Sequence, residues 1–174
     1  MSKLKPGITT HDRQLGNVNA KVTLVEFGDY QCPHCGHAYP LINRLIADLG
    51  DELHFVFRNF PLSEIHPMAL PAAIAAEAAA FQDKFWEMHD IIFENQTRLR
   101  NHIFVDFADE LKMDSKRFLA DSKSRAVEEK VEGDFESGVR SGVNGTPSFF
   151  LNGEKLDEYD GSYESIRHAI DTMR

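Results

Sequence analysis

The chain has few cysteines, little positive charge and no long apolar run, and each shortage narrows what the protein can be. Only 2 of its 174 residues are cysteine, which excludes a framework of several disulfides and fits a chain that lives with reduced thiols. No apolar stretch approaches the roughly 18 residues that mark a membrane-spanning helix. With 19 basic against 28 acidic residues, the net charge of -9 argues against nucleic acid and anionic membranes as partners.

The N-terminal segment and the composition set the class of protein. Residues 1–17 are hydrophilic and lack the apolar core of a secretory signal, so the sequence as written predicts a cytoplasmic protein. A mature exported form given a new start methionine, which would be periplasmic, stays open as the alternative. With 174 residues, 42% of them apolar, the chain is long enough for one globular domain that carries an insertion.

The two cysteines lie close together, at the ends of the run Cys-Pro-His-Cys that spans residues 32–35. An apolar run from Val22 to Phe27 predicts a buried strand, and a short loop follows it. Apolar residues then recur at helical spacing as far as Leu49, and Gly50 ends the helix. The cysteines therefore open a helix that follows a strand, which is the setting typical of a redox motif.

The helix start gives the two cysteines different roles. The thiolate is the nucleophilic form of cysteine, and the unpaired N–H groups and partial positive charge of a helix N-terminus favour it at Cys32. Pro33 fits the first turn, where a missing N–H costs nothing. A protonated or hydrogen-bonding His34 would stabilise that thiolate further. We expect Cys35, one turn inward, to be buried. It should resolve the mixed disulfide that Cys32 forms with a substrate.

Other interpretations of the motif remain open at this point. The two cysteines could be inert core thiols, and His34 could be an exposed, passive residue. Cys32, Cys35, His34 and His37 could also be read as metal ligands. Zinc normally takes four ligands from two separated pairs, and the chain has no second cluster, so no metal is predicted.

The remainder of the chain predicts helices inserted into an α/β layout. Residues 54–59 read as a second strand, and residues 63–123 carry helical patterns without strand signals. That segment is the expected insertion, and residues 1–62 and 124–174 form the main domain around it. Residues 1–21 are expected to be a loose leader. The expected helices cover residues 69–81, 85–93, 104–111, 115–119 after a cap at Asp114, and 124–141.

The C-terminal part predicts a hairpin followed by a helix. Residues 148–151 are apolar, and Asn152-Gly153 is a strong signal for a two-residue turn, so residues 154–159 should pair antiparallel with them. Ser162 is the expected cap of a final helix whose residues Ile166, Ile170 and Met173 face inward.

The chain resembles the DsbA family of thioredoxin-fold thiol–disulfide oxidoreductases, and within it the short bacterial branch. The resemblance covers residues 12–174 and rests on the Cys-Pro-His-Cys run, the position of the helical insertion, and Gly145-Thr146-Pro147 before the hairpin. It implies a thioredoxin fold with an inserted α-helical subdomain. It also implies disulfide exchange with protein or peptide substrates through Cys32 and Cys35, without a cofactor unless glutathione takes part.

The resemblance assigns roles to three further residues. Pro147 matches the family's cis-proline, which would place the backbone of Thr146 beside Cys32 so that a substrate strand can pair there. Glu26 lies six residues before Cys32, where thioredoxin-like proteins have a buried acid that exchanges protons with the resolving cysteine. A purely structural Glu26 is the alternative.

The direction and even the class of the activity stay open. The Cys-Pro-His-Cys run is typical of oxidising family members, whereas a reducing compartment would favour reductase or isomerase work through an unidentified redox partner. A peptide-binding module with structural cysteines is a different interpretation. A glutathione-dependent transferase or isomerase is a third, although such relatives usually lack the second cysteine.

Overall fold

The computed structural model describes residues 1–174, which form two compact units. Residues 1–28, 33–58 and 136–174 make up the first, here called the sheet unit. Residues 29–32 and 59–135 make up the second, the helical unit. Compared with the division expected from the sequence, the helical unit also includes the loop before the cysteine motif and the first part of the long helix α6 (Arg125–Arg140).

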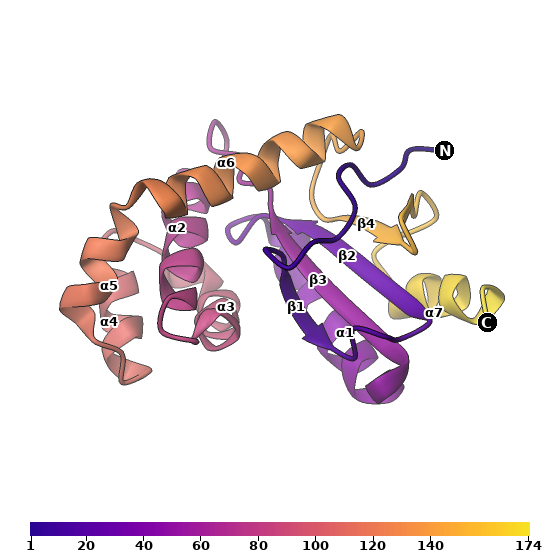
Figure 1. Ribbon diagram of the computed structural model, residues 1–174, viewed down its shortest axis with the longest axis horizontal. Coiled ribbons are helices and arrows are strands. Elements are labelled where there is room, and N and C mark those ends of the chain that lie inside the picture. Colours follow the sequence, from indigo (N-terminus) through magenta and orange to yellow (C-terminus); the bar gives the residue numbers. More distant parts are fainter. The chain divides into compact units, whose positions relative to one another are not determined.

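The sheet unit is built on five strands in the order β1-β3-β2-β4-β5. β4 runs antiparallel to β2, the middle strand, and β1 runs antiparallel to β3 at the edge, where Figure 1 shows it in indigo. Every residue of β3 and all but one of β2 are buried, as their apolar runs predict. The strands are β1 (Arg13–Gly16), β2 (Val22–Gly28), β3 (Leu53–Asn59), β4 (Ser148–Leu151) and β5 (Glu154–Lys155).

Two helices complete the sheet unit and contact each other: α1 (Pro33–Leu49), which carries the cysteine motif, and α7 (Tyr163–Thr172). Their contact includes the guanidinium of Arg44, which lies 3.9 Å from the ring centroid of Tyr163. The expected cap of α7 is confirmed, because Ser162 Oγ accepts a hydrogen bond of 3.1 Å from the N–H of Ser165.

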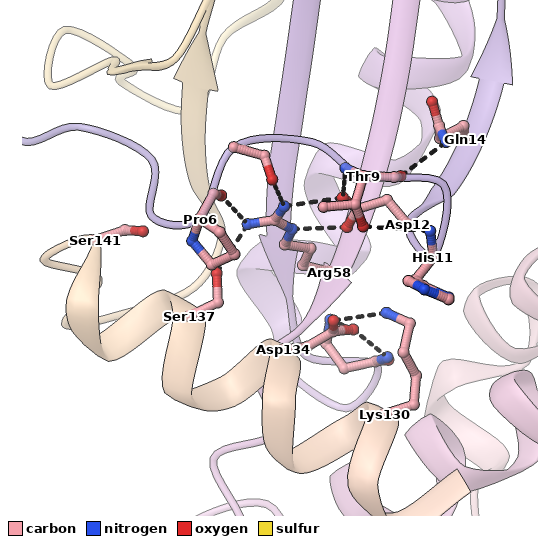
Figure 2. Close-up of polar contacts among 12 residues, drawn as sticks. Pro6, Thr9, His11, Asp12, Gln14, Arg58, Lys130, Asp134, Ser137 and Ser141 are labelled. Carbon is pink, nitrogen blue, oxygen red and sulfur yellow. Dashed lines mark hydrogen bonds and ion pairs between the residues drawn. The ribbon is translucent and has the colours of Figure 1, made fainter. Parts of the chain in front are cut away.

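The expectation that residues 1–21 form a loose leader is wrong, because they are an ordered part of the sheet unit. β1 lies within them, and Lys3 forms a bridge with Glu154. Buried Arg58 holds the segment: its Nε and Nη2 donate to the carboxylate of Asp12 at 2.7 and 2.9 Å (Figure 2). The other guanidinium N–H groups donate to the carbonyls of residues 6 and 7 and to Ser137 Oγ. All five donors of this buried cation are therefore used.

The helical unit contains four further helices at the predicted places. The alanine-rich α2 buries most of its residues and contacts α3 and α5, since small side chains let helices approach closely. The cap of α5 is confirmed: Asp114 accepts a hydrogen bond of 3.0 Å from the N–H of Arg117. The four helices are α2 (Ala69–Ala80), α3 (Phe85–Glu94), α4 (Ile103–Glu110) and α5 (Ser115–Ser122).

The helical unit also buries a polar group where β3 ends and α6 passes, as Figure 2 shows for Lys130 and Asp134. Asp134 accepts hydrogen bonds from the backbone and side-chain nitrogens of Asn59 and from Lys130 Nζ, at 2.6 to 3.0 Å. Burial raises the pKa of the Asp134 carboxyl, and the positive charge of Lys130 opposes that rise.

Three expectations at the C-terminal end need correction. The turn at Asn152-Gly153 is confirmed, with both residues at the positive φ that such hairpins require, but β5 is only two residues long. Met173 was expected to face inward and is 48% exposed. The helical spacing of residues 124–141 also predicted an apolar stripe that includes Val139, which is 57% exposed. No helix of this structure is long and apolar enough to cross a membrane.

Candidate active site

The cysteine motif opens α1, as the sequence predicts. The helix begins at Pro33, immediately after Cys32, and follows the middle strand β2 through a loop of four residues, 29–32. Pro33 and His34 are exposed, whereas Cys32 is 4% and Cys35 0% exposed. Both cysteines are buried free thiols in this structure. Their roles as attacking and resolving thiols stay predictions.

Cys32 belongs to the helical unit, where its backbone is held by two side chains. The carboxylate of Asp29 accepts a hydrogen bond of 3.1 Å from the N–H of Cys32. The side-chain amide of Gln96 donates to the carbonyls of Cys32 and Tyr30, at 2.8 and 3.0 Å. These bonds fix the peptide units on both sides of the Cys32 side chain. Sequence reasoning missed both residues, because Gln96 lies 64 residues from Cys32 and Asp29 also bonds to the distant Leu62 and His66, and such contacts leave no local pattern.

The loop before Cys32 is anchored further by a buried aromatic group. Tyr30 is 1% exposed, and its Oη lies 2.9 Å from Nδ1 of His89. The ring of Tyr30 also packs against Phe93, with 4.9 Å between the centroids. Burial lowers the pKa of His89 to about 3, so this imidazole is neutral at neutral pH. From the sequence, the position of His89 with Trp86 on one helical face favours core and rim residues over a functional site, and His89 is a core residue.

Cys35 belongs to the sheet unit, which also holds the predicted acid. Glu26 on β2 is 3% exposed, so its predicted burial is confirmed. Burial, together with the nearby Glu26, Cys35 and Asp160, raises the pKa of Tyr159 to about 12. Tyr159, Glu26 and Cys35 are therefore close enough to interact electrostatically. The sequence did not point to Tyr159, which follows the hairpin outside any motif. The catalytic role of Glu26 stays a prediction.

The Thr146–Pro147 peptide bond is cis, as the resemblance led us to expect. Both residues are half-buried and directly precede β4, whose first residue, Ser148, donates a hydrogen bond of 2.7 Å to the carbonyl of Gly145. The binding of a substrate strand at Thr146 and Pro147 stays a prediction.

The two histidines of the motif region differ in their surroundings. His34 is exposed, and its role in tuning Cys32 stays a prediction. His37, for which the sequence supported no functional role, donates a hydrogen bond of 2.9 Å from Nε2 to the carbonyl of Gly161. It thereby joins α1 to the segment before α7, which is a structural role.

Comparison with known sequences gives a family and two informative relatives. A family model described as thioredoxin matches residues 9–172. The chain is 40% identical over 161 residues to a protein of Salinispora arenicola named Na(+)/H(+) antiporter NhaA 1, and 42% identical over 154 residues to the NhaA of Herminiimonas arsenicoxydans. These matches cover 91% and 88% of this chain but only 24% of each relative, so the chain spans about a quarter of their length.

Solved structures match over nearly the whole chain. A thioredoxin-like oxidoreductase from Silicibacter pomeroyi superimposes with a TM-score of 0.81 at 25% identity, covering 95% of this chain and 94% of that one. BdbD from Bacillus subtilis, in its oxidised form, gives a TM-score of 0.79 at 25% identity, with coverage of 93% and 92%. The α/β fold with a helical insertion is thus the one these proteins have.

Proposed function

Because this chain belongs to the DsbA-like branch of the thioredoxin family, we propose that it is a thiol–disulfide oxidoreductase acting on protein or peptide substrates. One observation carries the proposal: a Cys-x-x-Cys pair opens the helix that follows the middle strand of the sheet. That placement gives Cys32 the N–H groups and positive end of α1, which favour the thiolate. The buried acid Glu26 in the same unit as Cys35 supports the proposal further.

The proposed reaction runs through a mixed disulfide. In the oxidising direction a substrate thiolate attacks Sγ of Cys32 in the Cys32–Cys35 disulfide, and the Cys35 thiolate leaves. A second substrate thiol then attacks its partner sulfur in the mixed disulfide and releases Cys32. One S–S bond forms in the substrate while one breaks in the enzyme, so two electrons and two protons pass to the cysteine pair. Glu26 is the group proposed to deliver the proton to Cys35.

Replacing each cysteine separately tests the mechanism. Cys35→Ser should accumulate a covalent adduct through Cys32, because the resolving thiol is gone, and Cys32→Ser should form none. The adduct is detected as a dithiothreitol-sensitive shift in mass after incubation with a disulfide-bonded, misfolded substrate, because the Cys32 thiolate opens a substrate S–S bond and one substrate sulfur leaves as a thiolate. If neither variant changes insulin reduction or the refolding of that substrate, the proposal fails. Normal partner binding by the double variant would then favour a peptide-binding module.

The direction of the reaction is decided by the reduction potential. The Cys-Pro-His-Cys run favours an oxidant, and equilibration with defined ratios of reduced and oxidised glutathione measures how oxidising the pair is. A potential near that of thioredoxin, about -270 mV, would rule out the oxidase and leave a reductase. A clearly higher potential supports the oxidase.

The named relatives suggest a class of partner. Since the chain matches a quarter of proteins named as Na(+)/H(+) antiporters, a membrane transporter with cysteine thiols is a candidate substrate. The Cys35→Ser variant, with Cys32 first held as a mixed disulfide with glutathione, tests this when it is incubated with separated membrane and soluble fractions, because a substrate thiolate attacks Cys32 Sγ and glutathione leaves as a thiolate. Adducts enriched in transporter peptides from the membrane fraction support this partner, and adducts confined to soluble proteins contradict it.

A further inference from the structure

The loop that leads into the cysteine motif is organised by one buried carboxylate. The side chain of Asp29 is 0% exposed, and four N–H groups donate to it. Oδ1 accepts from the backbone of Gln31 and Cys32 at 2.8 and 3.1 Å. Oδ2 accepts from the backbone of Leu62 at 3.0 Å and from Nδ1 of His66 at 2.8 Å. Both oxygens act as acceptors, which is how an ionised carboxylate bonds.

This negative charge lies close to the sulfur of Cys32. Oδ1 of Asp29 is 3.1 Å from the backbone nitrogen of Cys32, and Sγ is three covalent bonds from that nitrogen. The carboxylate is therefore within about 7 Å of Sγ. Because both residues are buried, little water screens the interaction between them. A carboxylate at this distance disfavours a second negative charge, which here is the Cys32 thiolate.

We propose that Asp29 is a positioning residue that sets the oxidising strength of the Cys32–Cys35 pair: it fixes the backbone of Cys32 and opposes the Cys32 thiolate. This proposal rests on the proposed function, because it concerns the same thiol pair. A dithiol whose thiolate is stabilised holds the reduced form and is a strong oxidant. The charge of Asp29 acts the other way and makes the pair a weaker oxidant than its Cys-Pro-His-Cys run alone would be.

Gln96 provides a neutral comparison at the same place. Its side-chain amide holds the carbonyl of Cys32, as Asp29 holds the N–H, but it carries no charge. If only the positioning of the Cys32 backbone mattered, the loss of either side chain would change the reduction potential of the pair by a similar amount. If the charge matters, only changes that alter the charge near Cys32 will shift the reduction potential.

The test is redox equilibration with glutathione on three variants of the full chain. In that equilibrium the S–S bond of glutathione disulfide breaks while one forms between Cys32 and Cys35, and two protons pass to the two glutathione thiols. Asp29→Asn keeps the size and one acceptor oxygen but removes the charge. We expect it to shift the equilibrium constant about tenfold toward the reduced pair, or ~30 mV. Gln96→Met, which removes the hydrogen bonds without adding charge, should leave the constant within about threefold.

His66→Lys provides a second route in case Asp29→Asn does not fold. It leaves Asp29 in place and adds a permanent positive charge beside Oδ2, which should shift the constant in the same direction as Asp29→Asn. The pKa of the Cys32 thiol, followed by thiolate absorbance, should fall in both variants and not in Gln96→Met. An unchanged potential in Asp29→Asn and His66→Lys, with a wild type that still exchanges disulfides, would overturn the role of Asp29 alone. A wild type that exchanges none would overturn the proposed function instead.

Discussion

The two units of this protein hold the two halves of the cysteine motif by different means. In the sheet unit, Cys35 is a helical residue, and regular backbone structure positions it. In the helical unit, Cys32 ends a loop whose backbone is fixed by the side chains of Asp29 and Gln96. The resolving thiol therefore depends on secondary structure, and the attacking thiol depends on individual polar side chains. The second arrangement is easier to tune, because one substitution changes the charge next to Cys32 without disturbing a strand or helix.

The two units also bury polar groups differently. The sheet unit buries a full ion pair, in which every donor of Arg58 is satisfied. The helical unit buries the carboxylates of Asp29 and Asp134 and, in addition, the imidazole of His89, which burial keeps neutral against the hydroxyl of Tyr30. Losing a partner of the ion pair leaves a charge in the interior, whereas acidifying the solution puts a new charge on His89. The experiments below use this difference, from the largest expected effect to the smallest.

The largest effect is expected at Arg58. Arg58→Met removes the cation and leaves the carboxylate of Asp12 buried without its partner, so the free energy of unfolding should fall by about 3–5 kcal/mol. Urea denaturation measures it. The matched control is Arg125→Met, which removes an exposed ion pair with Glu129 on α6 and should cost about 0.5 kcal/mol or less. A similar loss of unfolding free energy in both variants would contradict the claim that breaking the buried pair costs more than breaking the exposed one.

His89 should make the stability of the protein depend on pH. Its pKa is about 3 when folded and about 6.5 when unfolded, so below pH 6.5 the unfolded chain binds a proton that the folded chain does not. Stability contributed by this group is therefore lost as the pH falls, by about 2–3 kcal/mol between pH 6.5 and 4.5. His89→Gln should flatten this part of the curve of unfolding free energy against pH, and replacing the exposed His11 should not. Parallel curves for the wild type and His89→Gln would contradict this account.

Glu26 should affect one step of disulfide exchange. Glu26→Gln removes the proposed proton donor and acceptor for Cys35. In the reductive direction, where the Cys35 thiol must lose its proton to attack the mixed disulfide, resolution should therefore slow about tenfold to a hundredfold. Attack through Cys32 should keep its rate. Rapid acid quench followed by mass spectrometry separates the two steps, and Glu64→Gln, at an exposed site, is the control. Equal slowing of both steps would indicate a structural Glu26.

The smallest effect is expected at the helix caps, and it should be the same in both units. Asp114→Ala in the helical unit and Ser162→Ala in the sheet unit each remove a side-chain acceptor from a helix N-terminus. Each should lower the free energy of unfolding by about 1 kcal/mol, and Asp114→Asn should recover most of the loss. Caps act locally, so a much larger loss in one unit would show that its helix carries more of the stability than the local bonds suggest.

Local patterns in the sequence account for most of the secondary structure. The apolar run at residues 22–27, the turn at Asn152-Gly153 and the caps at Asp114 and Ser162 each specify neighbouring residues, and each is found as predicted. β1 was missed because its Arg-Gln-Leu-Gly sequence has no alternation, and its place at the sheet edge depends on the distant Arg58.

In the active site, too, local patterns could be predicted and contacts between distant segments could not. The cysteine pair and the strand before it could be found from spacing, and the resemblance supplied the cis-proline. Asp29, Gln96 and Tyr159 could not, because their effects depend on contacts between segments far apart in the chain. Asp29 lies three residues before Cys32, yet its importance shows only when its bonds to Leu62 and His66 are seen.

The position of β1 has a practical consequence for anyone who shortens this protein. A version that starts after Gly16 would leave β3 as the outermost strand of the sheet. That strand contains Phe55 and Phe57 and would then present unpaired backbone groups to solvent. We expect such a truncated chain to self-associate, so expression tags belong outside an intact N-terminal segment.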